Sequence, residues 1–241
     1  MTEKIASFVS LKLNIKIMTA KPFTEHEKAF YTDGYQLGME AFKTGQGQKS
    51  LFAAQASMYS AIDGLIDSLS EFAEKQGTPV HCKKGCEWCC HQPVFALSYE
   101  MDYLNHFFRE NFDEQLQLEI RKRAEQKRQK LGFLNEKEIL NSKFPCPLLE
   151  DGACSAYPAR PMACRIYLSA EVSTCLKFFD DPENTDSFPA LLDFPMRAGR
   201  LMNEGFKAAL KANGIKTQEF RLEEKILEDQ ALTHSSGSSI Q

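Results

Sequence analysis

The chain has 241 residues, of which 43% are hydrophobic and 26% charged, so it can bury a sizeable core and is not a wholly disordered protein. Its formal net charge is −4, which argues against a bulk nucleic-acid binder. Mean hydropathy is −0.38, and no stretch approaches the roughly 18 apolar residues that a membrane span needs, so we expect no membrane association. Eight cysteines in a chain of this length are too sparse for a small disulfide scaffold, in which cysteine exceeds about 8%.

Residues 1–20 are expected to be an N-terminal extension. Within it, residues 11–17 alternate between apolar and polar side chains, which predicts a short strand. Polar residues interrupt the apolar run and no small-residue cleavage site follows, so the segment does not resemble a secretory signal. We therefore expect a cytoplasmic protein, whose cysteines bind metal, do redox chemistry or stay free. Met18 is an alternative start, which would make the preceding segment an upstream artefact.

Residues 21–231 are expected to form a single helical domain. A capping box at Thr24–Glu27 predicts the start of a first helix, which ends near Gly45. A second, long helix is predicted over about residues 50–75, with Gly77 after it. Apolar side chains recur along this long helix at helical spacing, with one polar member: Leu51, Gln55, Met58, Ile62, Leu65, Leu69 and Phe72. The pattern favours a buried core stripe over a partner-binding coiled coil.

Further helices are predicted after the first cysteine cluster. Ser98 is expected to cap one helix, and a capping box at Asn111–Glu114 to open another that runs to about Leu131. The basic runs of that last helix indicate a solvated face more than a phosphate contact, so nucleic acid is not an expected partner. Two more helices are predicted over residues 187–212 and 217–231, followed by a disordered tail at 232–241. A protein partner is left open.

The cysteines fall into two groups. The first is a C-x3-C-x2-CC motif, and four thiols so closely spaced suit a tetrahedral metal better than strained disulfides. It comprises Cys82, Cys86, Cys89 and Cys90. Gly85 relaxes the backbone so that neighbouring thiols can turn toward one point. His81 and His91 flank the motif and could replace a thiolate, although each is expected to be a bystander.

The second group is looser and lies in a proline-rich segment that predicts an ordered loop rather than a helix. Its cysteines are Cys146, Cys154, Cys164 and, further on, Cys175. Asp151-Gly152 indicates a tight turn. Arg160 and Arg165 lie among these thiols and would offset the negative charge of a four-thiolate site, the alternative for each being a surface ion pair.

These motifs, in this order, resemble the YkgJ-type cysteine-cluster family, a domain described as zinc- or iron-chelating. The resemblance covers about residues 82–170 and rests on C-x3-C-x2-CC, then C-P-x-L, then C-S-x-Y-x-x-R-P-x-x-C-R. It implies that seven cysteines belong to a metal site. Cys175 lies beyond the matched region and is kept as a weaker candidate ligand, whereas Cys86, Cys89 and Cys164 are the first candidates for direct ligands. Ala156 and Pro158 depart from the family's commonest form without touching a ligand. A branch similar to this family is associated with lysine methylation, which keeps an enzyme hypothesis open.

The C-x3-C-x2-C spacing with Trp88 is also the local signature of radical S-adenosylmethionine enzymes. We disfavour that alternative because helical patterns surround the motif. Three thiolates hold the cluster in such enzymes, so Cys90 and the second group of cysteines would have no role.

The predicted fold is therefore mainly α, with two cysteine-rich irregular loops that converge on a metal centre and little or no β structure. The predicted function is metal binding through cysteine thiolates that hold Zn2+ or an iron–sulfur cluster, which ligand type alone does not separate. The alternative is a metal-dependent, protein-modifying enzyme such as a lysine methyltransferase-like protein.

Overall fold

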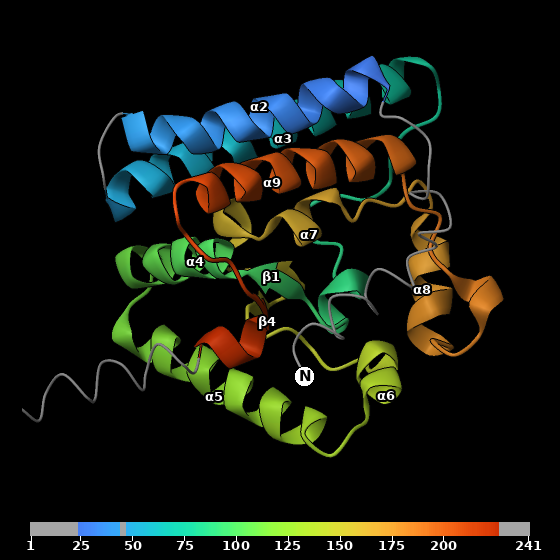
Figure 1. Cartoon of the computed structure of the whole chain (residues 1–241). Helices are drawn as coiled ribbons and strands as arrows, with labels where there is room; N and C mark the ends of the chain where they lie inside the picture. Colours follow the sequence, from blue (N-terminus) through green and yellow to red (C-terminus); the bar gives the residue numbers. More distant parts are fainter. Residues whose placement is uncertain (1–23, 44–46, 227–241) are drawn as a thin grey trace, which may run out of the picture.

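The computed structural model describes residues 24–43 and 47–226 (Figure 1). The strand predicted in residues 11–17 and the predicted tail at 232–241 lie outside these ranges. In the described part, helices dominate and the strands form two small two-stranded sheets, which confirms the mainly α class. No helix among these residues has the length and apolar character needed to cross a membrane.

Three long helices pack together on one side of the molecule: α2 (Glu25–Lys43), α3 (Gln48–Lys75) and α9 (Asp193–Ala212) (Figure 1). The predicted capping box begins α2, because the Glu27 N–H donates to Thr24 Oγ1 at 3.3 Å and the Thr24 N–H donates to the Glu27 carboxylate at 2.7 Å. The predicted start and end of α3 are within two residues of the observed ones.

Helices α2 and α9 touch backbone to backbone, because glycine occupies the points of closest approach. A Cβ atom on Gly34 would lie 1.9 Å from the Met202 carbonyl oxygen, and one on Gly205 would lie 2.0 Å from the Tyr31 carbonyl oxygen. No side chain fits at such distances, so these two glycines are required by the packing of the two helices rather than by a turn.

The apolar stripe of α3 is buried only along its first half. Met58 and Ile62 are fully buried in the core, and the Gln55 amide donates to the buried Tyr59 hydroxyl at 2.9 Å. Near the end of the helix, Phe72 is 63% exposed. The predicted core stripe is therefore correct for the first turns of the helix and wrong for its last ones.

A second layer holds α4 (Ser98–Asn111), α5 (Glu114–Leu131) and the short α6 (Glu136–Asn141), which the sequence did not predict. Two helices are capped by residues other than the predicted ones. Helix α4 begins after Leu97, whose N–H donates to the Glu100 carboxylate at 3.0 Å. Helix α5 is capped by Asp113, whose carboxylate accepts from the Leu116 N–H at 2.8 Å, rather than by Asn111.

The chain beyond α9 does not continue as the helix predicted over 217–231. Residues Glu219–Arg221 form strand β4, which pairs antiparallel with β1 (Phe95–Leu97), and helix resumes at 222–226. The helix predicted over 187–212 begins six residues later, at Asp193, after a 3-10 turn at Thr185–Ser187. Pairing with a distant strand, which no local pattern records, overrides the helical preference of residues 219–221.

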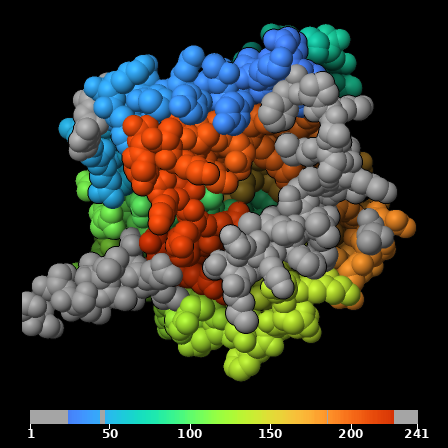
Figure 2. Space-filling view, in the orientation of Figure 1, coloured from blue at the N-terminus to red at the C-terminus, as the bar shows by residue number. Residues whose placement is uncertain are grey.

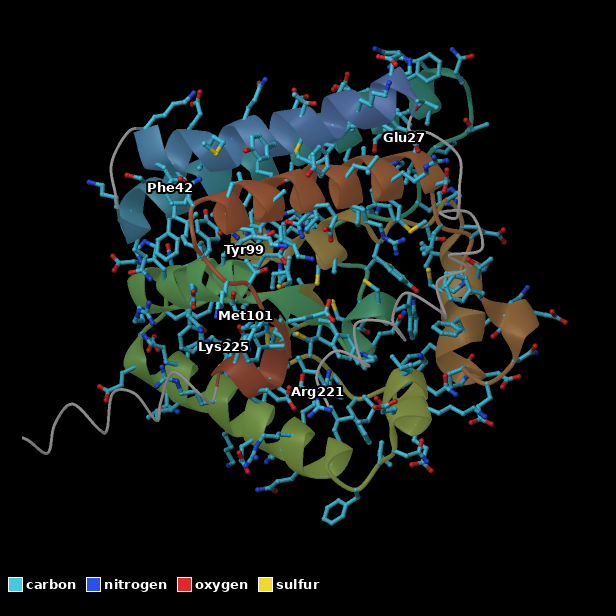
Figure 3. All side chains as sticks on the ribbon, viewed as in Figure 1. Glu27, Phe42, Tyr99, Met101, Arg221 and Lys225 are labelled. Atoms are coloured by element: carbon cyan, nitrogen blue, oxygen red, sulfur yellow. The ribbon has the colours of Figure 1, made fainter. Side chains whose placement is uncertain are left out.

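Helix α4 lies between two hydrophobic cores (Figure 3). Tyr99 belongs to the core that α4 shares with α2, α3 and α9, whereas Met101 belongs to the core that it shares with α5 and residues 222–226. Both side chains are at most 2% exposed. The cysteine-rich segments lie where these two cores meet.

Candidate metal centre

The first cysteine segment links α3 to β1 as a compact irregular loop. The Cys86 N–H donates to the Lys83 carbonyl at 3.0 Å, which closes a turn that contains Gly85 at φ 94°. A 3-10 turn, Trp88–His91, carries the last two cysteines of the motif. Helix α8 (Val172–Asp180) packs beside it, with the Phe179 ring 5.3 Å from Trp88 and 5.0 Å from His91. Local turns therefore set the direction of each thiol in this segment.

The second cysteine segment begins as a hairpin. Strands β2 (Leu149–Glu150) and β3 (Ala153–Cys154) pair across the predicted Asp151-Gly152 turn, in which both residues have positive φ. A 3-10 turn at Tyr157–Ala159 follows, and then the short helix α7 (Met162–Ile166). The prediction of a loop without helix is therefore wrong for residues 162–166, and Cys164 is positioned by a helix that starts after Pro161.

The two segments meet at their backbones. The Cys146 N–H donates to the Cys90 carbonyl oxygen at 2.7 Å, so residues from the two sequence groups are adjacent in space. Around them lies a cavity of about 1390 Å³, and all eight cysteines are free thiols. Seven of the eight line this cavity: Cys82, Cys86, Cys89, Cys90, Cys146, Cys154 and Cys164. Yellow sulfur atoms gather in this region, between α7, β1 and α8 (Figure 3).

Cys175 differs from the other seven. It is on α8, is 7% exposed, and does not line the cavity, although it is near enough to Cys82 to raise the pKa of that thiol. Among residues 24–43 and 47–226, no group of three or more His, Cys, Asp and Glu side chains is close enough together to hold a metal ion. The thiols thus share one cavity wall without being assembled as a coordination sphere.

Burial makes the thiolate form of the inner cysteines unfavourable. It raises the pKa of Cys146 to about 12 and that of Cys154 to about 11, with a smaller contribution from neighbouring thiols. Burial and three neighbouring thiols raise the pKa of Cys164 as well. A hydrogen bond between adjacent thiols raises the pKa of Cys89 and lowers that of Cys90. Several thiolates can therefore exist together here only if a positive charge offsets them.

Arg160 supplies one such charge. Its guanidinium lies 3.6 Å from the centroid of the Tyr157 ring and 3.5 Å from an Asp63 oxygen, and it lowers the pKa of Cys154 and Cys164. Its Nε and Nη1 atoms are buried without a hydrogen-bond partner. Such orphaned donors, beside a wall of thiols, suit hydrogen bonding to thiolate or sulfide ligands.

Arg165 has a different role. It is 1% exposed, its guanidinium lies 4.0 Å from the Tyr59 ring, and it donates to the Arg160 carbonyl at 2.9 Å and to the Pro158 carbonyl. It also pairs with Asp63, so one carboxylate on α3 holds both arginines. Arg165 thereby fixes the loop that presents Arg160 to the cavity. The side chains of both arginines are largely buried, so their ion pairs are not exposed surface pairs.

Glu100 is a residue of this site that the sequence analysis missed. It is 2% exposed and lines the cavity, and its carboxylate accepts from the Met162 N–H at 2.8 Å and the Tyr59 hydroxyl at 3.1 Å. Burial raises its pKa. Because Met162 begins α7, Glu100 anchors the helix that carries Cys164. A glutamate three residues into a predicted helix was the only available signal, and it indicates capping alone.

The flanking histidines do not join the thiols. His91 Nδ1 lies 3.2 Å from the Glu87 carbonyl oxygen and its ring packs on Phe179, while His81 is exposed. Neither lines the cavity. Tyr167 does line the cavity, and its hydroxyl oxygen accepts a hydrogen bond from the Gln92 side-chain amide at 3.1 Å.

Residues 81–183 match the model of the CxxCxxCC family, described as a "Putative zinc- or iron-chelating domain". The match supports metal binding by this part of the chain. It extends past Cys175, which the sequence analysis had placed beyond the family motif. No curated protein and no solved structure matches the chain.

The structure places the two residues that depart from the family's commonest form, and it shows the kind of sheet that the chain forms. Ala156 is fully buried in the second core, and Pro158 accepts a hydrogen bond from Arg165 through its carbonyl oxygen. Both sheets in the described ranges are two-stranded and antiparallel. That part of the chain thus lacks the parallel strands on which a radical S-adenosylmethionine site would be built.

Proposed function

We propose that this protein binds zinc or an iron–sulfur cluster in the cysteine-lined cavity, with ligands from both cysteine segments in one centre. The observation that carries the proposal is the hydrogen bond between Cys146 and Cys90, which brings the two segments together at the wall of the cavity. Thiolates are the ligands that both zinc and iron–sulfur clusters prefer.

The strongest candidate ligands are neighbouring thiols that come from both segments. Cys90, Cys146 and Cys154 all raise the pKa of Cys164, and Cys90 and Cys154 also raise that of Cys146. These four thiols come from both segments and match the four ligands that either metal centre requires. Cys89 is a further neighbour of this group, because Cys90 and Cys164 raise its pKa. Cys82 and Cys86 line the remainder of the cavity, and these three thiols are candidates for alternative ligands or for a second centre.

Metal binding by these residues would release protons from the thiols and would require the cysteine side chains to move closer together. The thiols must lose their protons to become ligands, and the Arg160 guanidinium would then offset part of the negative charge. The metal would supply the positive charge that the buried thiolates lack. Glu100 and Arg165 would keep α7 and the preceding loop in place while the thiols close around it.

The test is anaerobic purification followed by metal analysis and a visible absorption spectrum. Acid-labile sulfide with a brown colour identifies an iron–sulfur cluster, and a colourless protein with stoichiometric zinc identifies zinc. Serine replacements at Cys90, Cys146, Cys154 and Cys164, one at a time, should each lower bound metal sharply. Cys175→Ser is the matched control, because that thiol does not line the cavity. Full metal occupancy in all four variants would show that the proposed centre is wrong.

A further inference from the structure

The cysteine-lined cavity is much larger than a metal centre needs. Pockets that bind small organic ligands usually measure about 300–1000 Å³, and this cavity measures about 1390 Å³. The thiols occupy one part of its wall. The surface is hollowed below α9 (Figure 2), and α9 forms another part of the wall.

Helix α9 presents one continuous face to this cavity. The residues that line it recur at helical spacing over about three turns. They are Met196, Arg197, Arg200, Leu201, Asn203, Glu204 and Lys207. This face carries three cations, two of which are already paired with carboxylates.

The two paired cations are neutralised within the described residues. Arg197 pairs with Glu27 and lies 3.6 Å from Asp193, and the Lys207 ammonium lies 3.4 Å from Glu204. These ion pairs leave no excess charge for a ligand.

Arg200 is the exception. It is half-buried and lines the cavity, and it forms no hydrogen bond or ion pair with any residue of the described ranges. Burial lowers the pKa of its guanidinium, an effect that the charge of Asp193 only partly offsets, so its own charge is poorly solvated. A poorly solvated guanidinium without a hydrogen-bond partner favours a carboxylate or phosphate group, with which it can form two parallel hydrogen bonds.

The wall of the cavity that Arg200 lines is mainly apolar. The side chains in question come from four different elements or loops and share an aliphatic character: Ile66, Leu97, Leu168, Met196 and Leu201. A ligand that fits this wall has an apolar body as well as a charged end.

We propose that this cavity binds a small organic anion, a carboxylate or a phosphate ester with an apolar chain, whose charged group pairs with Arg200. The inference deepens the proposed function, because the apolar chain of such a ligand would extend along the cavity that also holds the proposed metal centre. Anion binding itself depends on α9 and does not require the metal.

Calorimetric titration of the full chain, in metal-loaded and metal-free forms, tests the proposal with hexanoate, hexyl phosphate and inorganic phosphate as probes. Hexylammonium, with the same chain and the opposite charge, is the control ligand. At least one of the two hexyl anions should bind saturably, about tenfold or more tightly than hexylammonium. Whichever hexyl anion binds more tightly identifies the charged group, and inorganic phosphate measures the contribution of the chain.

The variants separate this site from the metal centre. Arg200→Gln should weaken anion binding about tenfold or more while bound metal stays unchanged, and Arg200→Lys should recover part of the affinity. Lys211→Gln removes a charge from an exposed position of the same helix and should have no effect. Cys164→Ser should lower bound metal and leave anion affinity intact. Equal anion affinity in wild type and Arg200→Gln, equal binding of hexylammonium, or no saturable anion binding by the wild type would each overturn the proposal.

Discussion

The backbone N–H of Cys146 donates to the carbonyl oxygen of Cys90, and this 2.7 Å hydrogen bond joins two segments that helices α4, α5 and α6 separate in the sequence. Neither segment has a regular element longer than the five residues of α7. Each therefore relies on the other, and on whatever the cavity binds, for its order.

Metal removal should consequently loosen both segments together. Limited proteolysis of the metal-free protein should cut near residues 78–95 and 145–175, while α3 stays protected because it also packs against α2 and α9 in the first core. Cys164→Ser should expose residues 82–90 as well as its own segment. Protection of the first segment in that variant, with its metal retained, would mean that the two groups form independent sites.

The raised thiol pKa values predict that the metal-free protein loses stability at alkaline pH. The pKa of Cys146 in the folded chain is about 12 and that of Cys154 about 11, against a usual value of about 9. Because the unfolded chain releases these protons first, the stabilisation is complete below pH 9 and is lost as pH rises through 11 and 12.

Urea denaturation of the reduced, metal-free protein at several pH values measures this loss. The free energy of unfolding should fall by about 1.4 kcal/mol per pH unit for each such thiol above pH 9. Cys146→Ser should flatten the slope. Metal affinity should change in the opposite direction and rise with pH, since bound thiols must be deprotonated. A metal-free protein whose stability does not change between pH 9 and 11 would contradict the prediction.

Glu100 should couple the core to the metal centre. In Glu100→Gln the new amide group cannot accept a hydrogen bond from both the Leu97 and Met162 N–H groups, so one buried donor loses its partner. We expect a loss of about 1–3 kcal/mol in the free energy of unfolding together with weaker metal binding, because α7 carries Cys164. Glu110→Gln, at an exposed position of the same helix, is the control and should change neither.

Arg160 should affect metal binding more than stability. Its guanidinium packs on Tyr157 and its two orphaned N–H groups lie beside the thiols. Removal of partners that surround metal ligands typically lowers affinity about 10- to 100-fold. We expect a loss in that range for Arg160→Gln and a smaller one for Arg160→Lys, which keeps the charge. Competition with a chelator measures both, and Arg128→Gln on α5, which breaks an exposed pair with Glu125, should match the wild type.

Gly34 should tolerate no side chain. A Cβ atom there would meet the Met202 backbone at 1.9 Å, and backbone atoms on both helices cannot give way cheaply. Gly34→Ala should destabilise the protein by about 3 kcal/mol or more. Gly64→Ala in α3, where no atom lies within 4 Å, should instead stabilise it by about 0.5–1 kcal/mol. Thermal unfolding of the two variants makes the comparison, and equal melting temperatures would show that α2 and α9 are not in backbone contact.

The sequence by itself determined the features that depend on local chemistry. Hydrophobic spacing and the Thr24–Glu27 box predicted α2 and α3 nearly to the residue, because a helix forms from contacts three and four positions apart. The Asp151-Gly152 pair predicted the hairpin turn for the same reason. The two cysteine motifs pointed to metal chemistry, and the match over residues 81–183 agrees with them.

Only the tertiary structure decided what depends on residues far apart in the chain. The β1–β4 pairing replaced a predicted helix, exposure of Phe72 ended a predicted core stripe, and burial made Glu100 an anchor for α7. The position of Cys175 outside the cavity wall and the half-buried position of Arg200 in it likewise arise from packing between distant elements. The burial of a side chain and its hydrogen-bond partners depend on which distant segments pack against it. A local pattern of residue types does not specify those segments.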